Sequence, residues 1–102
     1  MNIKFKLHNS TLYILMIGEL DENTADYARL ILDDNILNYV YDNVIFDMSE
    51  LEFMDSTGIG VLIGRYKKLK NKQKNIYIAN PSRTIEKIFN MSGIYEIMPK
   101  IS

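Results

Sequence analysis

The sequence predicts a single α/β domain in which helices pack on a mixed β-sheet, and three observations support this fold class. The chain has 102 residues, of which 47% are hydrophobic and 25% charged, enough for one compact core and not for two. Its first two apolar segments are joined by turn residues, as in a β-hairpin. Helical and apolar patterns then alternate, which gives the order β-β-α-β-α-β-α-β: an antiparallel start, then parallel strands joined by right-handed crossovers.

The predicted hairpin contains two kinds of strand. Residues 3–7 read IKFKL and alternate strictly, which predicts a half-buried edge strand with Lys4 and Lys6 outward. Residues 12–18 read LYILMIG, a continuous apolar run that is typical of a strand covered on both faces. The HNST segment between them supplies the turn.

A first helix is predicted over residues 21–40. Asn23 and Thr24 are both suitable N-caps, and acidic residues occupy the first turns, where the helix dipole favours them. Small and apolar residues recur along one side at helical spacing, so this side should face the sheet: Ala25, Ala28, Leu32 and Ile36.

A second helix, predicted from Ser56 to about Lys72, follows residues 43–49 (NVIFDMS), which look like another strand buried on both faces. At 100° per residue, the side of this helix that packs on the sheet should carry Ile59, Leu62, Ile63, Tyr66 and Leu69. The opposite side is lightly substituted and then basic, and carries Thr57, Gly60, Val61, Gly64 and Lys68.

The C-terminal third predicts a strand, a short helix and the beginning of another strand. Residues 75–81 (NIYIANP) form an apolar strand ended by Pro81. Residues 82–93 form a short helix in which Gly93 supplies the C′ position. The helix should point Ile85, Ile88 and Phe89 inward. Residues 97–102 (IMPKIS) resemble the start of a further strand.

Two strand-to-helix turns are candidates for one functional rim. Residues 18–21 (GELD) and 55–58 (DSTG) both follow predicted strands, and functional groups in such sheets gather at the carboxyl ends of parallel strands. The net charge changes sign at the second turn: residues 1–55 carry 11 acidic and 3 basic side chains, and residues 56–102 carry 2 acidic and 9 basic, which together give the net charge of -1. We therefore expect electrostatics to matter for whatever binds there.

Three glycines in the second helix resemble a phosphate-binding motif without matching one. Gly58, Gly60 and Gly64 are spaced G-x-G-x-x-x-G, one residue longer than the dinucleotide fingerprint, and no P-loop lysine follows the last of them. Two interpretations stay open. The glycines either permit tight packing of helix on sheet, or form a smooth surface on which a partner's backbone docks closely.

Ser56 could serve as a helix cap, a nucleophile or a phosphorylation site. A nucleophile needs a positioned base, but His8 is the only histidine and follows an edge strand, and Asp55 with Glu52 makes no convincing acid pair. As an N-cap, the hydroxyl would accept an amide hydrogen bond from the first turn. A phosphate of about -1.5 to -2 charge is also tolerated at a helix N-terminus, and would make the surface beside Asp55 strongly acidic.

Composition excludes several kinds of site and function. Without cysteine and with one histidine, the chain has no disulfide, no thiolate metal site and no histidine cluster. No segment approaches the ~20 apolar residues of a membrane helix, and the N-terminus lacks the apolar core of a signal peptide, which favours the cytoplasm. The basic run at residues 65–74 is typical of a solvated helix end, and the net charge does not favour nucleic acid.

Several segments resemble the STAS-domain anti-sigma factor antagonists, in particular the stage II sporulation protein AA type, which acts on the sporulation anti-sigma F factor. They are GELD (18–21), VIFDMSELEFMDSTGIGVLIGRYK (44–67) and FNMSG (89–93). The resemblance covers nearly the whole chain in the expected order, and FMDSTGIGVLIGRYK is its most specific part. It implies one STAS domain over residues 1–102.

The resemblance also implies a site. In this family the partner anti-sigma factor, a serine kinase that uses ATP, phosphorylates the serine after the aspartate, which is Ser56 here, with Thr57 as a secondary acceptor. The GELD loop helps to engage the partner, which implicates Asp21, and Asp55 should shape the site. With the lightly substituted helix side, the expected partner-binding set is Asp21, Asp55, Ser56, Thr57, Gly58, Gly60, Val61 and Gly64.

The implied function is partner switching by a non-enzymatic cytoplasmic protein without a cofactor. The unphosphorylated form binds the anti-sigma factor and so frees the sigma factor for sporulation-type transcription. Phosphorylation weakens the complex with the anti-sigma factor, and a phosphoserine phosphatase reverses the phosphorylation. One departure is that the sequence stops at IMPKIS, so the last strand and C-terminal helix usual in the family are expected to be absent or incomplete. Two alternatives are a STAS scaffold subunit of a stress-signalling assembly and a small nucleotide-binding or hydrolytic enzyme that uses Asp55 and Ser56.

Overall fold

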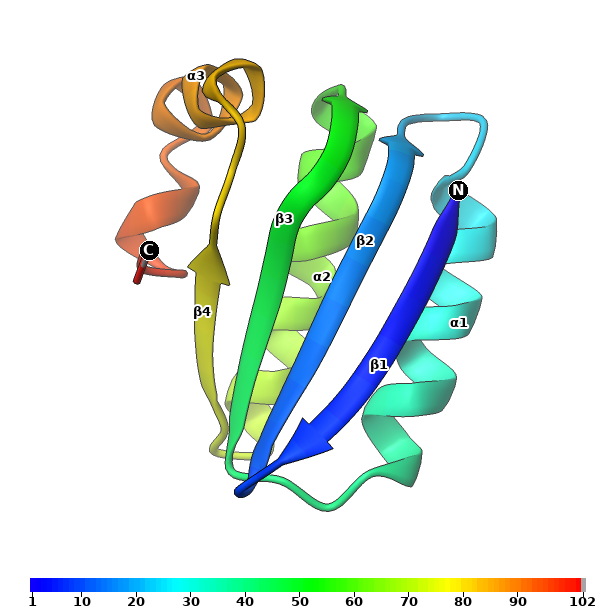
Figure 1. The fold of residues 1–102 in the computed structure, drawn as a ribbon, viewed down its shortest axis with the longest axis vertical. Helices are drawn as coiled ribbons and strands as arrows, with labels where there is room; N and C mark the ends of the chain where they lie inside the picture. The colour runs from blue at the N-terminus through cyan, green and yellow to red at the C-terminus, as the bar shows by residue number, and fades with distance from the viewer. Residues whose placement is uncertain (102) are drawn as a thin grey trace.

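The computed structural model describes residues 1–101 and confirms the predicted mixed sheet, a four-stranded sheet of order β1-β2-β3-β4. β1 runs antiparallel to β2, whereas β2, β3 and β4 are parallel (Figure 1). The elements are β1 (Asn2–His8), β2 (Thr11–Leu20), α1 (Ala25–Asn38), β3 (Asn43–Met54), α2 (Ser56–Asn71), β4 (Asn75–Ala79), α3 (Arg83–Ser92) and the 3₁₀ helix η1 (Ile94–Glu96).

The hairpin between β1 and β2 closes through a two-residue turn. Asn9 and Ser10 both have positive φ, at 47° and 64°, which is the backbone that a type I′ turn requires and that asparagine tolerates. His8 pairs with Thr11 directly across the turn. β1 is therefore an edge strand, as its alternating sequence predicts.

Helices α1 and α2 cover one face of the sheet, and the opposite face carries no helix (Figure 1). The predicted inward residues of α1 are all buried: Ala25, Ala28, Leu32 and Ile36. In β2, however, burial alternates, since Leu12, Ile14 and Met16 are inaccessible while Tyr13 is 38% exposed. The expectation that residues 12–18 and 43–49 are covered on both faces is therefore wrong, because helices lie on one side only.

The orientation of α2 also differs from the predicted one. Its buried residues are Gly58, Val61, Leu62, Arg65 and Leu69. Ile59, Ile63 and Tyr66 lie at the border of this face and are only partly buried. Val61 was expected on the exposed side, and that placement is wrong. The apolar pattern could not indicate this rotation, because a glycine and an arginine take two of the buried positions.

The C-terminal third follows the prediction up to Gly93. The Ser82 side chain caps α3 by accepting a hydrogen bond from the Ile85 amide, and Gly93 ends the helix with φ of 75°. Beyond it lies η1, which the sequence did not predict. Of the strand start expected over residues 97–102, the described part forms one parallel bridge, between Lys100 and Ile78 of β4, and residue 102 lies outside the described residues. No helix in the described part of the chain is long and apolar enough to cross a bilayer.

An ion pair holds this C-terminal segment against α3. Lys100 Nζ lies 3.0 Å from Glu86 Oε2, and the hydrogen bond from Lys100 lowers the pKa of Glu86 below its ordinary value of 4.5. A carboxylate whose pKa is lowered in the folded state stabilises the fold above pH 4.5, and this contribution is lost as pH falls through the lower folded pKa.

We expect Lys100→Met to raise the pKa of Glu86 toward 4.5, measured by an NMR titration of its side-chain carboxyl carbon. Lys87→Met, at an exposed position next to Glu86 on α3, is the matched control and should leave that pKa unchanged. Equal titration curves for the wild type and Lys100→Met would contradict the proposed role of the ion pair.

Candidate functional site

Asp55 connects the two turns that the sequence analysis placed on a common rim. Its Oδ1 accepts a hydrogen bond from the Gly58 amide at 2.9 Å, which caps α2, and its Oδ2 accepts one from the Glu22 amide at 3.2 Å. The Asp55 amide in turn donates to the Leu20 carbonyl at 3.4 Å. The ends of β2 and β3 therefore meet, as expected from the carboxyl ends of parallel strands.

The N-cap of α2 is Asp55, and the alternative that Ser56 caps the helix is wrong. A carboxylate can accept hydrogen bonds from both turns at once, whereas a hydroxyl at the first helical position is displaced outward. Ser56 is exposed, and its side chain makes no hydrogen bond with any of the described residues. The hydroxyl is thus free at the positive end of a 16-residue helix.

Gly58 permits the close contact between the two turns. A Cβ at this position would lie 2.3 Å from the Leu20 carbonyl oxygen and 2.8 Å from Cγ of Met54. Gly58 is therefore needed for internal packing, which was one of the two interpretations of the glycines, and it is buried. Gly60 and Gly64 differ, since apart from the adjoining backbone of α2 no atom lies within 4 Å of a Cβ built there.

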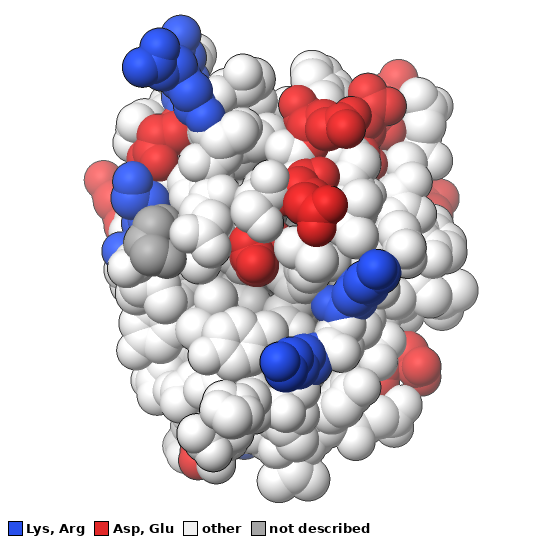
Figure 2. Space-filling view, viewed as in Figure 1, with Lys and Arg blue, Asp and Glu red and all other residues white. Residues whose placement is uncertain are grey.

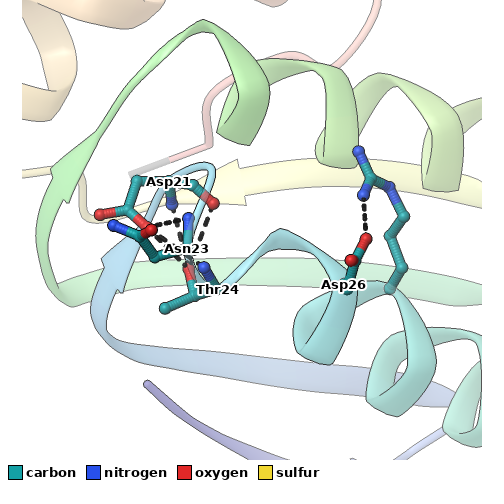
Figure 3. A network of polar contacts seen from close by, with 5 residues as sticks. Asp21, Asn23, Thr24 and Asp26 are labelled. Carbon is teal, nitrogen blue, oxygen red and sulfur yellow. Dashed lines mark hydrogen bonds and ion pairs between the residues drawn. The ribbon is translucent and has the colours of Figure 1, made fainter.

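The turn that follows β2 is ordered by Asp21 and Thr24 (Figure 3). Asp21 Oδ1 accepts hydrogen bonds from the amides of Asn23 (2.9 Å) and Thr24 (3.2 Å). The Asp21 amide donates to Thr24 Oγ1 at 3.0 Å, and the Thr24 hydroxyl donates to the Glu19 carbonyl at 2.9 Å. The Asp21 carboxylate thus shapes its own loop, and Thr24 is the N-cap residue of α1 without a capping bond from its side chain.

Acidic side chains gather at the end of the sheet where α2 begins. Figure 2 shows them gathered over the upper ends of β2 and β3. Four are exposed and two are half-buried: Glu19, Glu22, Glu50, Glu52, Asp21 and Asp55. Phe53 lies among them in sequence, pairs across the strands with Glu19 and is 43% exposed. The sequence did not indicate Phe53, because the predicted strand ends at residue 49 whereas β3 continues to Met54 and places Phe53 at the surface.

Of the predicted partner-binding residues, the structure places most at the surface. Asp21, Asp55, Thr57 and Gly64 are half-buried, and Ser56 and Gly60 are exposed. Val61 is fully buried, so its side chain cannot contact a partner. Gly58 is also buried and has no side chain. His8 is the last residue of β1, next to the hairpin turn at the opposite end of the sheet, and Asn9 is its hydrogen-bond partner. Among residues 1–101, no three acidic or histidine side chains are grouped as metal ligands.

Comparison with known proteins gives a consistent result. The model of the STAS domain matches residues 2–102. The anti-sigma F factor antagonist of Paenibacillus polymyxa is 31% identical over 99 residues, which cover 97% of this chain and 85% of the relative. The anti-sigma-B factor antagonist of Staphylococcus epidermidis is 30% identical over 98 residues, which cover 96% of this chain and 90% of the relative.

Solved structures of the anti-sigma factor antagonist SpoIIAA are also similar to this chain. The unphosphorylated form is 27% identical, with a TM-score of 0.80 over 99% of this chain and 89% of the other. The phosphorylated form from Bacillus has the same identity and a TM-score of 0.71, over 99% and 92%. The family model spans nearly all of the chain and the relatives align almost end to end, so this chain belongs to the STAS-domain family.

Proposed function

We propose that this protein is an anti-sigma factor antagonist that binds an anti-sigma factor through the surface around Ser56. In this proposal the anti-sigma factor is a serine kinase that uses ATP, and it phosphorylates Ser56. The phosphorylated form dissociates from the anti-sigma factor, and a phosphoserine phosphatase removes the phosphate and so restores binding. The protein acts in the cytoplasm as a binding partner rather than an enzyme, and regulates sporulation-type transcription.

The observation that carries this proposal is the free hydroxyl of Ser56. Because Asp55 already caps α2, phosphorylation of Ser56 breaks no hydrogen bond among the described residues. The helix N-terminus tolerates the added charge, so the fold should remain intact. The same modification changes the outer surface greatly, since it adds about -1.5 to -2 charges. They join the acidic rim, which is the group of Glu19, Asp21, Glu22, Glu50, Glu52 and Asp55.

The acidic rim indicates the kind of partner surface. Glu19, Glu22 and Glu52 are exposed at the ends of β2 and β3 and in the turn after β2, which favours a partner with complementary basic groups. Gly60 and Gly64 would let the partner's backbone approach α2, because apart from the adjoining helix backbone nothing lies within 4 Å of their Cβ positions. A phosphate on Ser56 would keep the partner's backbone from this close approach and would have to lose its water on binding, and these steric and desolvation costs would outweigh its attraction to basic groups. A penalty of about 3 kcal/mol would lower affinity more than a hundredfold.

The test is to incubate the protein with a candidate anti-sigma serine kinase and ATP, and to map the modification by mass spectrometry. We expect a single phosphate on Ser56, lost in Ser56→Ala and kept in Thr57→Ala, which is the matched control. Ser56→Asp should bind the kinase at least a hundredfold more weakly than Ser56→Ala, with both variants folded by circular dichroism. A phosphate at another residue, or equal binding by the two variants, would refute the switch.

A further inference from the structure

The face of the sheet opposite α1 and α2 is unusual for a sheet with three parallel strands. Parallel strands are generally covered on both faces, because they carry apolar residues on both. Here no helix covers the second face (Figure 1), and that face carries apolar side chains from all three parallel strands. They are Tyr13, Leu15, Ile17, Ile45 and Tyr77, of which Tyr13 is 38% exposed and the others are half-buried. We call these five residues with Lys4, Lys6 and Asp47 the open face.

Charges on the open face are arranged on either side of its apolar centre. The strand register places Lys4 opposite Leu15 and Leu15 opposite Asp47, so the three form one row across β1, β2 and β3. Lys4 is exposed and Asp47 half-buried, and neither forms an ion pair within residues 1–101. Asp47 Oδ1 accepts only the Ser49 amide, at 3.0 Å.

We propose that the open face binds a second copy of this chain, sheet against sheet. The twofold axis lies midway between the two sheets, directly over β2 and parallel to it. This rotation keeps each residue at the same height along the strands, and it places β1 of one copy over β3 of the other. Lys4 of each copy then faces Asp47 of the other, and Leu15 faces Leu15. The pairing occurs twice, as an isologous interface requires. Sheets that pack in this way lie about 10 Å apart, which a lysine and an aspartate side chain can span together.

Charge selects this axis over the other face-to-face twofold arrangement. The alternative axis also lies between the two sheets but runs across the strands, along the row of Lys4, Leu15 and Asp47. It would place Lys4 over Lys4 and Asp47 over Asp47, and like charges in an interface are costly. The face itself is small. About four strands by six residues is on the order of 400 Å² in projection, so the dimer should be weak and reversible. The dimer uses none of the residues proposed to bind the anti-sigma factor.

The experiment is sedimentation velocity of the full chain from about 5 μM to 1 mM. We expect a concentration-dependent dimer, weakened at least tenfold by Lys4→Asp and by Asp47→Lys. The double variant Lys4→Asp/Asp47→Lys should restore association to within about threefold of the wild type. Lys87→Asp, a charge reversal at an exposed position on α3, should have no effect. Thermal unfolding of each variant verifies that it is folded.

Cross-linking tests the same arrangement without changing a charge. The chain contains no cysteine, so Leu15→Cys introduces a single thiol close to the proposed axis. A short bis-maleimide should link two copies of Leu15→Cys, and should not link Leu37→Cys, which is 69% exposed on α1. The proposal is overturned if the wild type stays monomeric at 1 mM, or if Leu37→Cys cross-links better than Leu15→Cys. It is also overturned if neither single charge reversal weakens the dimer, or if the double variant fails to restore association.

Discussion

Gly58→Ala is expected to destabilise the protein by about 3 kcal/mol, at the upper end of what overpacking a core site costs. The added methyl group would lie 2.3 Å from the Leu20 carbonyl oxygen. That oxygen belongs to the backbone and accepts the Asp55 amide, so it cannot move aside as the end of a flexible side chain can. Urea denaturation should show the loss of stability, and a fall in Tm of roughly 15 °C should accompany it.

Gly60→Ala is the matched control, two residues along the same helix. Apart from the adjoining backbone of α2, nothing lies within 4 Å of its Cβ position, so the new methyl group meets no obstacle. Alanine is a better helix former than glycine by about 1 kcal/mol, so this variant should be more stable than the wild type. If both substitutions changed stability in the same direction, the close contact between α2 and the end of β2 would not be what requires glycine at position 58.

Asp33→Ala is expected to destabilise the protein by about 2–3 kcal/mol, because it leaves a buried charge unpaired. Arg65 is 6% exposed, and its Nε lies 3.0 Å from Asp33 Oδ1, the one close anionic partner among residues 1–101. Burial lowers the pKa of Arg65, and Asp33 opposes that shift. Lys68 Nζ, 2.8 Å from Asp33 Oδ2, is half-exposed and should contribute little.

The replacement Arg65→Met distinguishes the cost of burying a charge from the cost of losing a contact. A methionine keeps the packing of α2 on the sheet without a charge, so this variant should be within about 1 kcal/mol of the wild type, and Asp33→Ala/Arg65→Met should be more stable than Asp33→Ala. Asp34→Ala, at the neighbouring exposed position, should change stability by less than about 0.5 kcal/mol. A double variant no more stable than Asp33→Ala would contradict this account of Arg65.

Local sequence patterns predict the element order and most of the interior correctly. Alternation in residues 3–7 identifies the edge strand, helical spacing identifies Ala28 and Leu32 as buried, and Gly93 marks the end of α3. Each depends on the period or backbone preference of a few neighbouring residues. The same patterns fail for residues 12–18, because an apolar run does not reveal whether a helix covers one face of the sheet or both.

Local patterns are enough to predict the order of the elements, the position of Ser56 at a helix start and the resemblance of the surrounding segment to a family. They do not predict which residue caps that helix, which side of α2 faces the sheet, or that Gly58 serves internal packing while Gly60 and Gly64 stay open. The physical reason is that these features depend on contacts between segments far apart in the chain. The Glu22 amide reaches Asp55 across 33 residues, and no local period encodes that contact.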